Sequence, residues 1–103
     1  MPINPKVYIV QEVPGINVLS ARRFGDLQTM LPSGQISMRT NTAVLQLKKQ
    51  LKFFKAEDYL LLIGDPLLIG LATAIALESS GGHARFLKWD RQTTSYYALE
   101  ASI

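Results

Sequence analysis

Cysteine is absent from this sequence, and histidine occurs once, as His83. Without cysteine the chain cannot form a disulfide framework, a thiolate metal site or a reactive thiol. A single histidine excludes His-paired metal sites and the HExxH motif of zinc proteases. The G-x-S-x-G, Walker A and G-x-G-x-x-G motifs are also missing. We therefore predict that the protein is not an enzyme and holds no cofactor; a catalytic site would require His83, Asp58 and Asp65 to converge in one cleft.

Secretion and membrane insertion find little support. The first residues lack the basic and apolar segments of a signal peptide. Residues 59–77 contain one charge, Asp65, and are long enough to span a bilayer. An aspartate at a helix centre costs about 2.5–3.5 kcal/mol on insertion, and a buried strand followed by a buried helix avoids that cost. We expect a cytoplasmic protein without membrane contact.

Acidic residues are scarce in the first half of the chain. Residues 1–55 carry a net charge of +6, whereas residues 56–103 carry −3. This division indicates either an anionic partner or head-to-tail contacts between subunits. Two solvated faces that average out in the fold explain it equally well.

Hydrophobic patterning and chain length predict a single domain, residues 1–103, of five strands and two helices. The strands are predicted at 6–13, 26–31, 59–63, 83–89 and 94–101, and the helices at 42–55 and 66–79, in the order β-β-α-β-α-β-β. Residues 16–24 are ambiguous, and residues 35–41 are predicted to form a loop. Asn41 or Thr42 can cap the first helix, and Asp65 followed by Pro66 marks the start of the second. The pattern alone indicates a generic α+β domain, which could contain a β-α-β unit around residues 58–89.

Lysines gather on one face of the first predicted helix. Val44, Leu47, Leu51 and Phe54 recur at helical spacing and predict the buried face. The adjoining face holds Lys48, Lys49, Lys52 and Lys55, with no acidic residue between positions 41 and 56. Internal ion pairs on the helix therefore cannot explain these lysines. A phosphate backbone would attract them, and a solvated helix face is the alternative.

The last two predicted strands mix aromatic and cationic side chains. Interleaved residues of these types can stack on bases and hold phosphates, although the aromatics can equally form core. The residues concerned are Arg85, Phe86, Lys88, Trp89, Arg91, Tyr96 and Tyr97.

The second predicted helix is apolar almost all round, which indicates burial on more than one side. Gly70, Thr73 and Ala74 form a stripe of small residues that permits close packing. The helix is then either a subunit interface or an ordinary core helix. Together with the low charged fraction of 18%, it favours a homo-oligomer.

Three stretches carry a resemblance: 17–32 (NVLSARRFGDLQTMLP), 59–76 (YLLLIGDPLLIGLATAIA) and 86–100 (FLKWDRQTTSYYALE). Together they resemble a family of uncharacterised marine cyanophage proteins. The resemblance implies an Sm-like fold, a small bent five-stranded β-barrel that joins its neighbours edge to edge in a ring. It also implies a role in nucleic-acid binding in the cytoplasm of the infected host cell. A generic α+β domain is the alternative fold.

The chain departs from ordinary Sm proteins, because it lacks their base-binding loop motifs and has a second helix between strands. No Sm binding residue can be transferred to it. We predict a ring-forming protein that binds RNA or single-stranded DNA; the alternative is a structural or assembly protein that acts through homo-oligomerisation alone. The predicted nucleic-acid-binding residues are Arg22, Arg23, Arg39, Lys48, Lys49, Lys52, Lys55 and Trp89.

Overall fold

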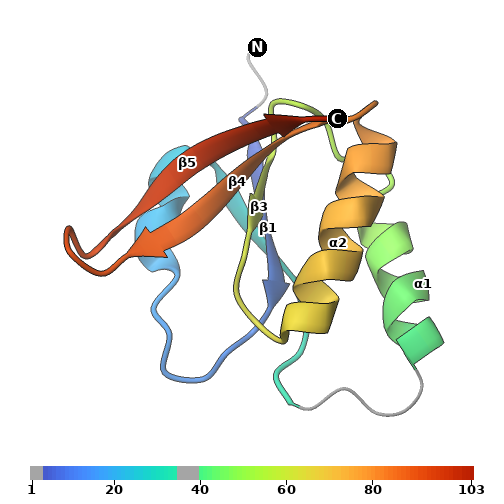
Figure 1. Cartoon of the computed structure of the whole chain (residues 1–103). Coiled ribbons are helices and arrows are strands. Elements are labelled where there is room, and N and C mark those ends of the chain that lie inside the picture. The colour runs from blue at the N-terminus through green and yellow to red at the C-terminus, as the bar shows by residue number, and fades with distance from the viewer. Residues whose placement is uncertain (1–3, 35–39) are drawn as a thin grey trace.

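A computed structural model describes residues 4–34 and 40–103, in which five strands form one sheet flanked by helices (Figure 1). The strands are β1 (Lys6–Gln11), β2 (Asp26–Leu31), β3 (Tyr59–Leu61), β4 (His83–Asp90) and β5 (Ser95–Ser102). The helices are the 3₁₀ helix η1 (Leu19–Phe24) and the α-helices α1 (Thr40–Gln50) and α2 (Pro66–Ser79). The predicted element order is confirmed, with η1 added in the stretch that the sequence left ambiguous.

The sheet has the strand order β2-β1-β3-β4-β5. Strands β2, β1, β3 and β4 run parallel to one another, and β5 runs antiparallel to β4. The chain runs outward from β1 to β2 and then returns past β1 to β3, the reversal that characterises doubly wound α/β sheets. The predicted β-α-β unit is confirmed, because β3 and β4 are parallel neighbours joined by α2.

The Sm-like barrel expected from the resemblance is not confirmed. The sheet is open, with β2 and β5 as its edges, and its strand order differs from the expected one. Parallel neighbours need long crossovers, and here these place helices against both faces of the sheet. The protein is a mixed α/β domain with a five-stranded sheet and two α-helices.

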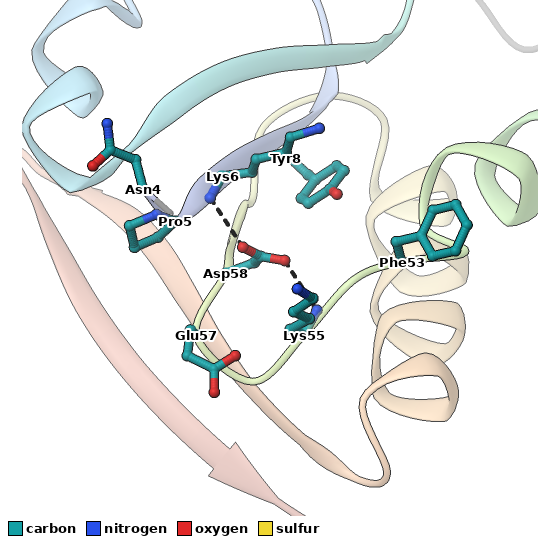
Figure 2. A pocket seen from close by; sticks show the side chains of 8 residues that line it. All are labelled: Asn4, Pro5, Lys6, Tyr8, Phe53, Lys55, Glu57 and Asp58. Carbon is teal, nitrogen blue, oxygen red and sulfur yellow. Dashed lines mark hydrogen bonds between the residues drawn. The ribbon is translucent and has the colours of Figure 1, made fainter. Parts of the chain in front are cut away.

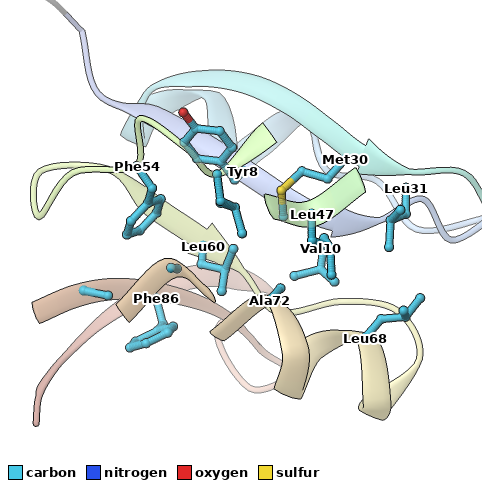
Figure 3. Packing of buried hydrophobic residues seen from close by; sticks show 13 residues of the cluster. Tyr8, Val10, Met30, Leu31, Leu47, Phe54, Leu60, Leu68, Ala72 and Phe86 are labelled. Atoms are coloured by element: carbon cyan, nitrogen blue, oxygen red, sulfur yellow. The ribbon is translucent and has the colours of Figure 1, made fainter. Parts of the chain in front are cut away.

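Each face of the sheet buries its own cluster of apolar side chains. The larger cluster lies under α1 and α2 and includes Tyr8, Val10, Leu47, Leu60 and Ala72 (Figure 3). The smaller cluster lies under η1 and consists of Val7, Ile9, Ala21, Leu61, Leu87 and Tyr96. Successive side chains of β1 and β3 belong alternately to the two clusters, because the pleat of a strand directs them to opposite faces.

The first α-helix differs from its prediction at both ends. It begins at Thr40, so Asn41 and Thr42 lie inside the helix and the predicted caps are wrong. It ends at Gln50, and a turn follows in which Phe54 N–H donates to the Leu51 carbonyl at 3.0 Å. This turn still buries Leu51 and Phe54, so the apolar spacing continues past the helix end.

The corner between β3 and α2 is built as the sequence indicates. Asp65 caps α2, because its Oδ1 accepts the Leu67 N–H at 2.8 Å, and Pro66 takes the first helical position. Gly64 has a φ of +121°, and a Cβ there would lie 2.5 Å from Gln11 Cβ. Gln11 is buried and joins three strand ends, since its Oε1 accepts Asp65 N–H and its Nε2 donates to the Pro32 and Gly34 carbonyls.

The remaining bounds follow the predictions closely. The strand 26–31 and the helix 66–79 are confirmed, and β1 and β3 end two residues early. In the closing hairpin, β4 ends one residue later than predicted and β5 is shifted by one residue. Most of the predicted loop, residues 35–39, lies outside the described residues. In the parts of the chain that the structure describes, no helix has the length and apolarity needed to cross a bilayer.

Candidate nucleic-acid interface

The four predicted lysines occupy one continuous stretch, which we call the lysine segment: Lys48, Lys49, Lys52 and Lys55. The first two lie in the last turn of α1, and the others lie in and after the turn that follows. All four side chains are exposed. The segment keeps its position because α2 ties the turn down, with the Ser79 hydroxyl donating to the Leu51 carbonyl at 2.7 Å.

An exposed aromatic ring lies within the lysine segment. Phe53 is 74% exposed, although the flanking apolar residues Leu51 and Phe54 are buried. The ammonium group of Lys52 lies 5.6 Å from the centroid of the Phe53 ring. A ring with an open face among cations can stack on an unpaired base while the cations hold its phosphates.

A hollow of about 350 Å³ adjoins this ring, between the start of β1 and the chain leading into β3 (Figure 2). Two lysines, Lys6 and Lys55, line it together with Tyr8 and Phe53. The carboxylates of Asp58 and of the exposed Glu57 also line the hollow. Asp58 accepts the backbone N–H groups of Lys6 at 2.9 Å and Lys55 at 3.0 Å. Since both carboxylate oxygens are occupied in joining these two segments, Asp58 has a structural role.

The hydroxyl of Tyr8 borders the same hollow. Burial raises the pKa of Tyr8 above its usual 10.0, and the negative charge of Asp58 raises it further. The phenol is therefore neutral at physiological pH and adds no negative charge beside the lysines.

A second hollow of about 330 Å³ lies on the other side of the lysine segment. Lys48 and Lys52 line it from the first helix and the turn, and Ile75, Glu78 and Ser79 line it from α2. The lysine segment is thus bordered by two hollows, and Glu78 is the one carboxylate among the described residues that line the second.

The predicted arginines and tryptophan lie on the opposite face of the sheet. Arg22 and Arg23 belong to η1, and Trp89 points to the same face from β4, where its ring packs edge-on against Tyr96 with centroids 4.9 Å apart. Arg23 donates to the Tyr96 carbonyl at 2.7 Å and stacks on the Phe24 ring at 4.6 Å. The structure therefore brings the four lysines together but separates them from these residues. Arg39 lies outside the described residues.

Trp89 borders a hollow of its own at the carboxyl end of the parallel strands. This hollow measures about 290 Å³ and is lined by Gly15, Ile16, Asn17, Ile63, Trp89 and Tyr96. Trp89 is 43% exposed there. The described residues of its lining are mostly apolar and include no cation, so they do not provide the phosphate contacts available at the lysine segment.

The residues considered for catalysis do not converge. Asp58 and Asp65 flank opposite ends of β3, and each carboxylate is engaged by backbone N–H groups. His83 begins β4, with its Nδ1 2.5 Å from the Ser102 hydroxyl. Within residues 4–34 and 40–103, no three His, Asp or Glu side chains are placed to hold a metal ion.

Sequence reasoning missed two residues of this surface, Phe53 and Lys6. Phe53 departs from the apolar spacing of Leu47, Leu51 and Phe54, and that departure was a readable signal of exposure. Lys6 could not be found, because its approach to Lys55 depends on β1 pairing with β3.

Comparison with known proteins places the chain in a family. No curated protein and no solved structure matches it. A family model described as phage Pam3 gp32-like protein matches residues 5–103, nearly the whole chain. The expected phage relationship is thereby confirmed, and the chain belongs to the phage Pam3 gp32-like protein family.

Proposed function

We propose that this phage-family protein binds single-stranded RNA or DNA, without catalysis, through the lysine segment and Phe53. The observation that supports the proposal is the exposed Phe53 ring among cations, with Lys52 beside it and Lys55 across the adjoining hollow. The expected setting is the cytoplasm of an infected cell, and a cyanobacterial host is part of this proposal.

The physical basis is a combination of two terms. Each lysine that neutralises a phosphate releases a counterion, so binding weakens as salt is added. Stacking of one base on an aromatic ring contributes about 1–3 kcal/mol and does not depend on the base. A duplex offers the first term but not the second, because its bases are already stacked. The arrangement therefore favours single strands without strong sequence preference.

The salt dependence of binding tests the lysine segment. Fluorescence anisotropy of labelled single-stranded RNA, single-stranded DNA and duplex DNA at about 50 and 200 mM salt covers the informative range. Replacing all four lysines of the segment with glutamine should weaken binding and reduce the salt slope for single strands by up to about 3, since each phosphate contact contributes about 0.7. Unchanged binding by this variant would contradict the site.

A matched pair of variants separates the two faces. Lys49→Gln with Lys52→Gln removes two charges from the lysine segment, and Arg22→Gln with Arg91→Gln removes two exposed charges elsewhere. The first pair should reduce the salt slope by about 1.4, and the second should leave it nearly unchanged. A larger loss in the arginine pair would move the interface to the η1 face.

Removal of the ring tests stacking. Phe53→Ala should weaken binding of single strands by about 5- to 150-fold, the range that corresponds to one lost base stack, and leave duplex binding unaffected. Leu45→Ala is the control, because Leu45 is also an exposed apolar residue of the same region, at 68%. Equal losses for single strands and duplex would refute a stacking role.

The alternative function is that of an assembly protein which acts through homo-oligomerisation. The observation that favours it is the unpaired outer edge of β5. It predicts a stable oligomer with no affinity for nucleic acid even at about 50 mM salt, where phosphate contacts are strongest.

A further inference from the structure

The outer edge of β5 carries backbone groups without a strand partner. In an antiparallel ladder, residues turn their N–H and C=O groups alternately toward and away from the neighbouring strand. Ile103 N–H donates to the Gly82 carbonyl at 2.8 Å, and the pairing of β4 with β5 continues from there without a bulge. The Leu87 carbonyl points the other way, toward Leu62 N–H. These two bonds fix the alternation, and the outward-facing residues of β5 are Tyr96, Ala98, Glu100 and Ser102.

This edge has few of the features that normally prevent strand pairing. Its eight residues include no proline and no lysine, and its register with β4 is regular. One outward group is covered, because Arg23 donates to the Tyr96 carbonyl at 2.7 Å. In Figure 1, β5 lies at the margin of the sheet with its outer side open. Among the residues that the structure describes, no hydrogen bond occupies the outward backbone groups of Ala98, Glu100 and Ser102, and the Tyr96 carbonyl accepts from Arg23 alone.

Apolar side chains extend along the same edge. Tyr97 and Leu99 are 39% and 44% exposed, and they point to the face that carries α2. Tyr97 and Leu99 are thus apolar side chains at the edge that the described residues leave exposed.

We propose that a second copy of this chain pairs with β5 in antiparallel orientation, about a twofold axis at Ala98. A twofold axis perpendicular to the sheet keeps the α2 faces of both copies on the same side. A side chain on that face must therefore meet a side chain on the corresponding face of the second copy. With Ala98 opposite its counterpart, Tyr97 meets Leu99 of the second copy twice, a favourable aromatic–aliphatic pair. The two sheets then form one continuous sheet of ten strands.

Charge complementarity supports this register. Glu100 of one copy comes opposite Tyr96 of the other, and its N–H would share the Tyr96 carbonyl with the Arg23 guanidinium, because a carbonyl oxygen has two lone pairs. The pairing therefore brings a carboxylate and a guanidinium together on both sides of the axis. An axis at Leu99 would instead place Glu100 opposite Ala98 and give up this contact.

Single cysteines test the pairing, because the chain has none of its own. In the proposed register two Ala98 Cα atoms lie about 5.5 Å apart, within disulfide range. The Cα atoms of two copies of Leu99 lie about 8 Å apart and those of Glu100 about 14 Å, both beyond that range. Ala98→Cys should therefore give a disulfide-linked dimer under mild oxidation, whereas Leu99→Cys, Glu100→Cys and the exposed control Ser20→Cys should not. Preferred crosslinking at another position, or equal crosslinking at all, would overturn the proposal.

Sedimentation of the unmodified protein gives an independent measurement. We expect a concentration-dependent dimer, and a monomer at all concentrations or a larger closed ring would overturn the proposal.

Ala98→Pro removes an outward N–H that the fold does not use, and edge strands tolerate proline. This variant should dissociate the dimer, and Ala98→Ser, which keeps the N–H, should not. Circular dichroism of both variants establishes that the fold is retained.

Discussion

The two faces of the sheet differ in how they are covered and in what their cations do. Two α-helices bury one face, and the lysines there project into solvent. A single 3₁₀ helix covers the other face, where Arg23 and Arg85 make internal contacts while Arg22 is exposed. Arg23 bonds to the Tyr96 carbonyl, and Arg85 stacks on the Tyr59 ring at 4.0 Å and donates to the Glu57 carbonyl. Arg23 and Arg85 thus help to complete the thinner core of the η1 face, whereas the four lysines of the lysine segment stay exposed.

Truncation of two neighbouring leucines of β3 should give the largest effect and tests whether the two faces differ in packing. Leu60 and Leu61 are both 0% exposed but point to opposite faces. Truncation of a buried leucine to alanine costs about 2–5 kcal/mol, and more where the surroundings cannot collapse into the cavity. Leu60 packs between the sheet and two helices, so we expect Leu60→Ala to lower the free energy of unfolding by an amount near the upper end of that range. The loss for Leu61→Ala should lie near the lower end. Urea unfolding measures both, and an equal or reversed order would contradict the difference between the faces.

The fold was predictable where local signals and tertiary structure agree. Asp65 and Pro66 marked the start of α2 because capping and proline geometry are local effects. The helix end at Gln50 was not predictable, since Leu51 and Phe54 continue the apolar spacing through a turn. Periodicity reports which residues face the core and leaves open how the backbone brings them there.

Strand order was beyond local reasoning. The five strands were counted correctly, but the barrel came from the resemblance, and their pairing depends on contacts between segments far apart in sequence. The same limit applies to the candidate site. The four lysines were found from their spacing, whereas the separation of Arg22, Arg23 and Trp89 from them followed from the placement of η1 and β4.

Substitution of one arginine and one lysine tests the different roles of the cations on the two faces, with a smaller expected effect on stability. Arg23→Ala loses a hydrogen bond of 2.7 Å and a stack on Phe24, and we expect a loss of about 1 kcal/mol in the free energy of unfolding. Lys52→Ala removes an exposed ammonium 5.6 Å from the Phe53 centroid and should change stability by less than about 0.5 kcal/mol. Both are measured by urea unfolding at one fixed protein concentration. Arg23→Lys is the control, because it keeps the charge but loses the planar stack, and equal effects of the two alanine variants would refute the distinction.

The smallest effect concerns one buried tyrosine on each face. Burial raises the pKa of both Tyr8 and Tyr96 above 10.0, and Asp58 raises that of Tyr8 further. Because the fold disfavours the phenolate, the stability from each group is complete below pH 10.0 and is lost as the pH rises through the raised pKa. The free energy of unfolding should therefore fall above about pH 10, and less steeply in Tyr8→Phe or Tyr96→Phe.

Salt separates the two causes of these shifts. Added salt screens the influence of Asp58 but leaves the desolvation of a buried ring unchanged. Raising the salt from about 0.05 to 1 M, which shortens the screening length to about 3 Å, should lower the pKa of Tyr8 more than that of Tyr96. Ultraviolet titration of the single phenylalanine variants assigns each transition. Equal salt shifts for the two tyrosines would show that Asp58 does not act on Tyr8, and the two faces would then perturb their buried phenols by desolvation alone.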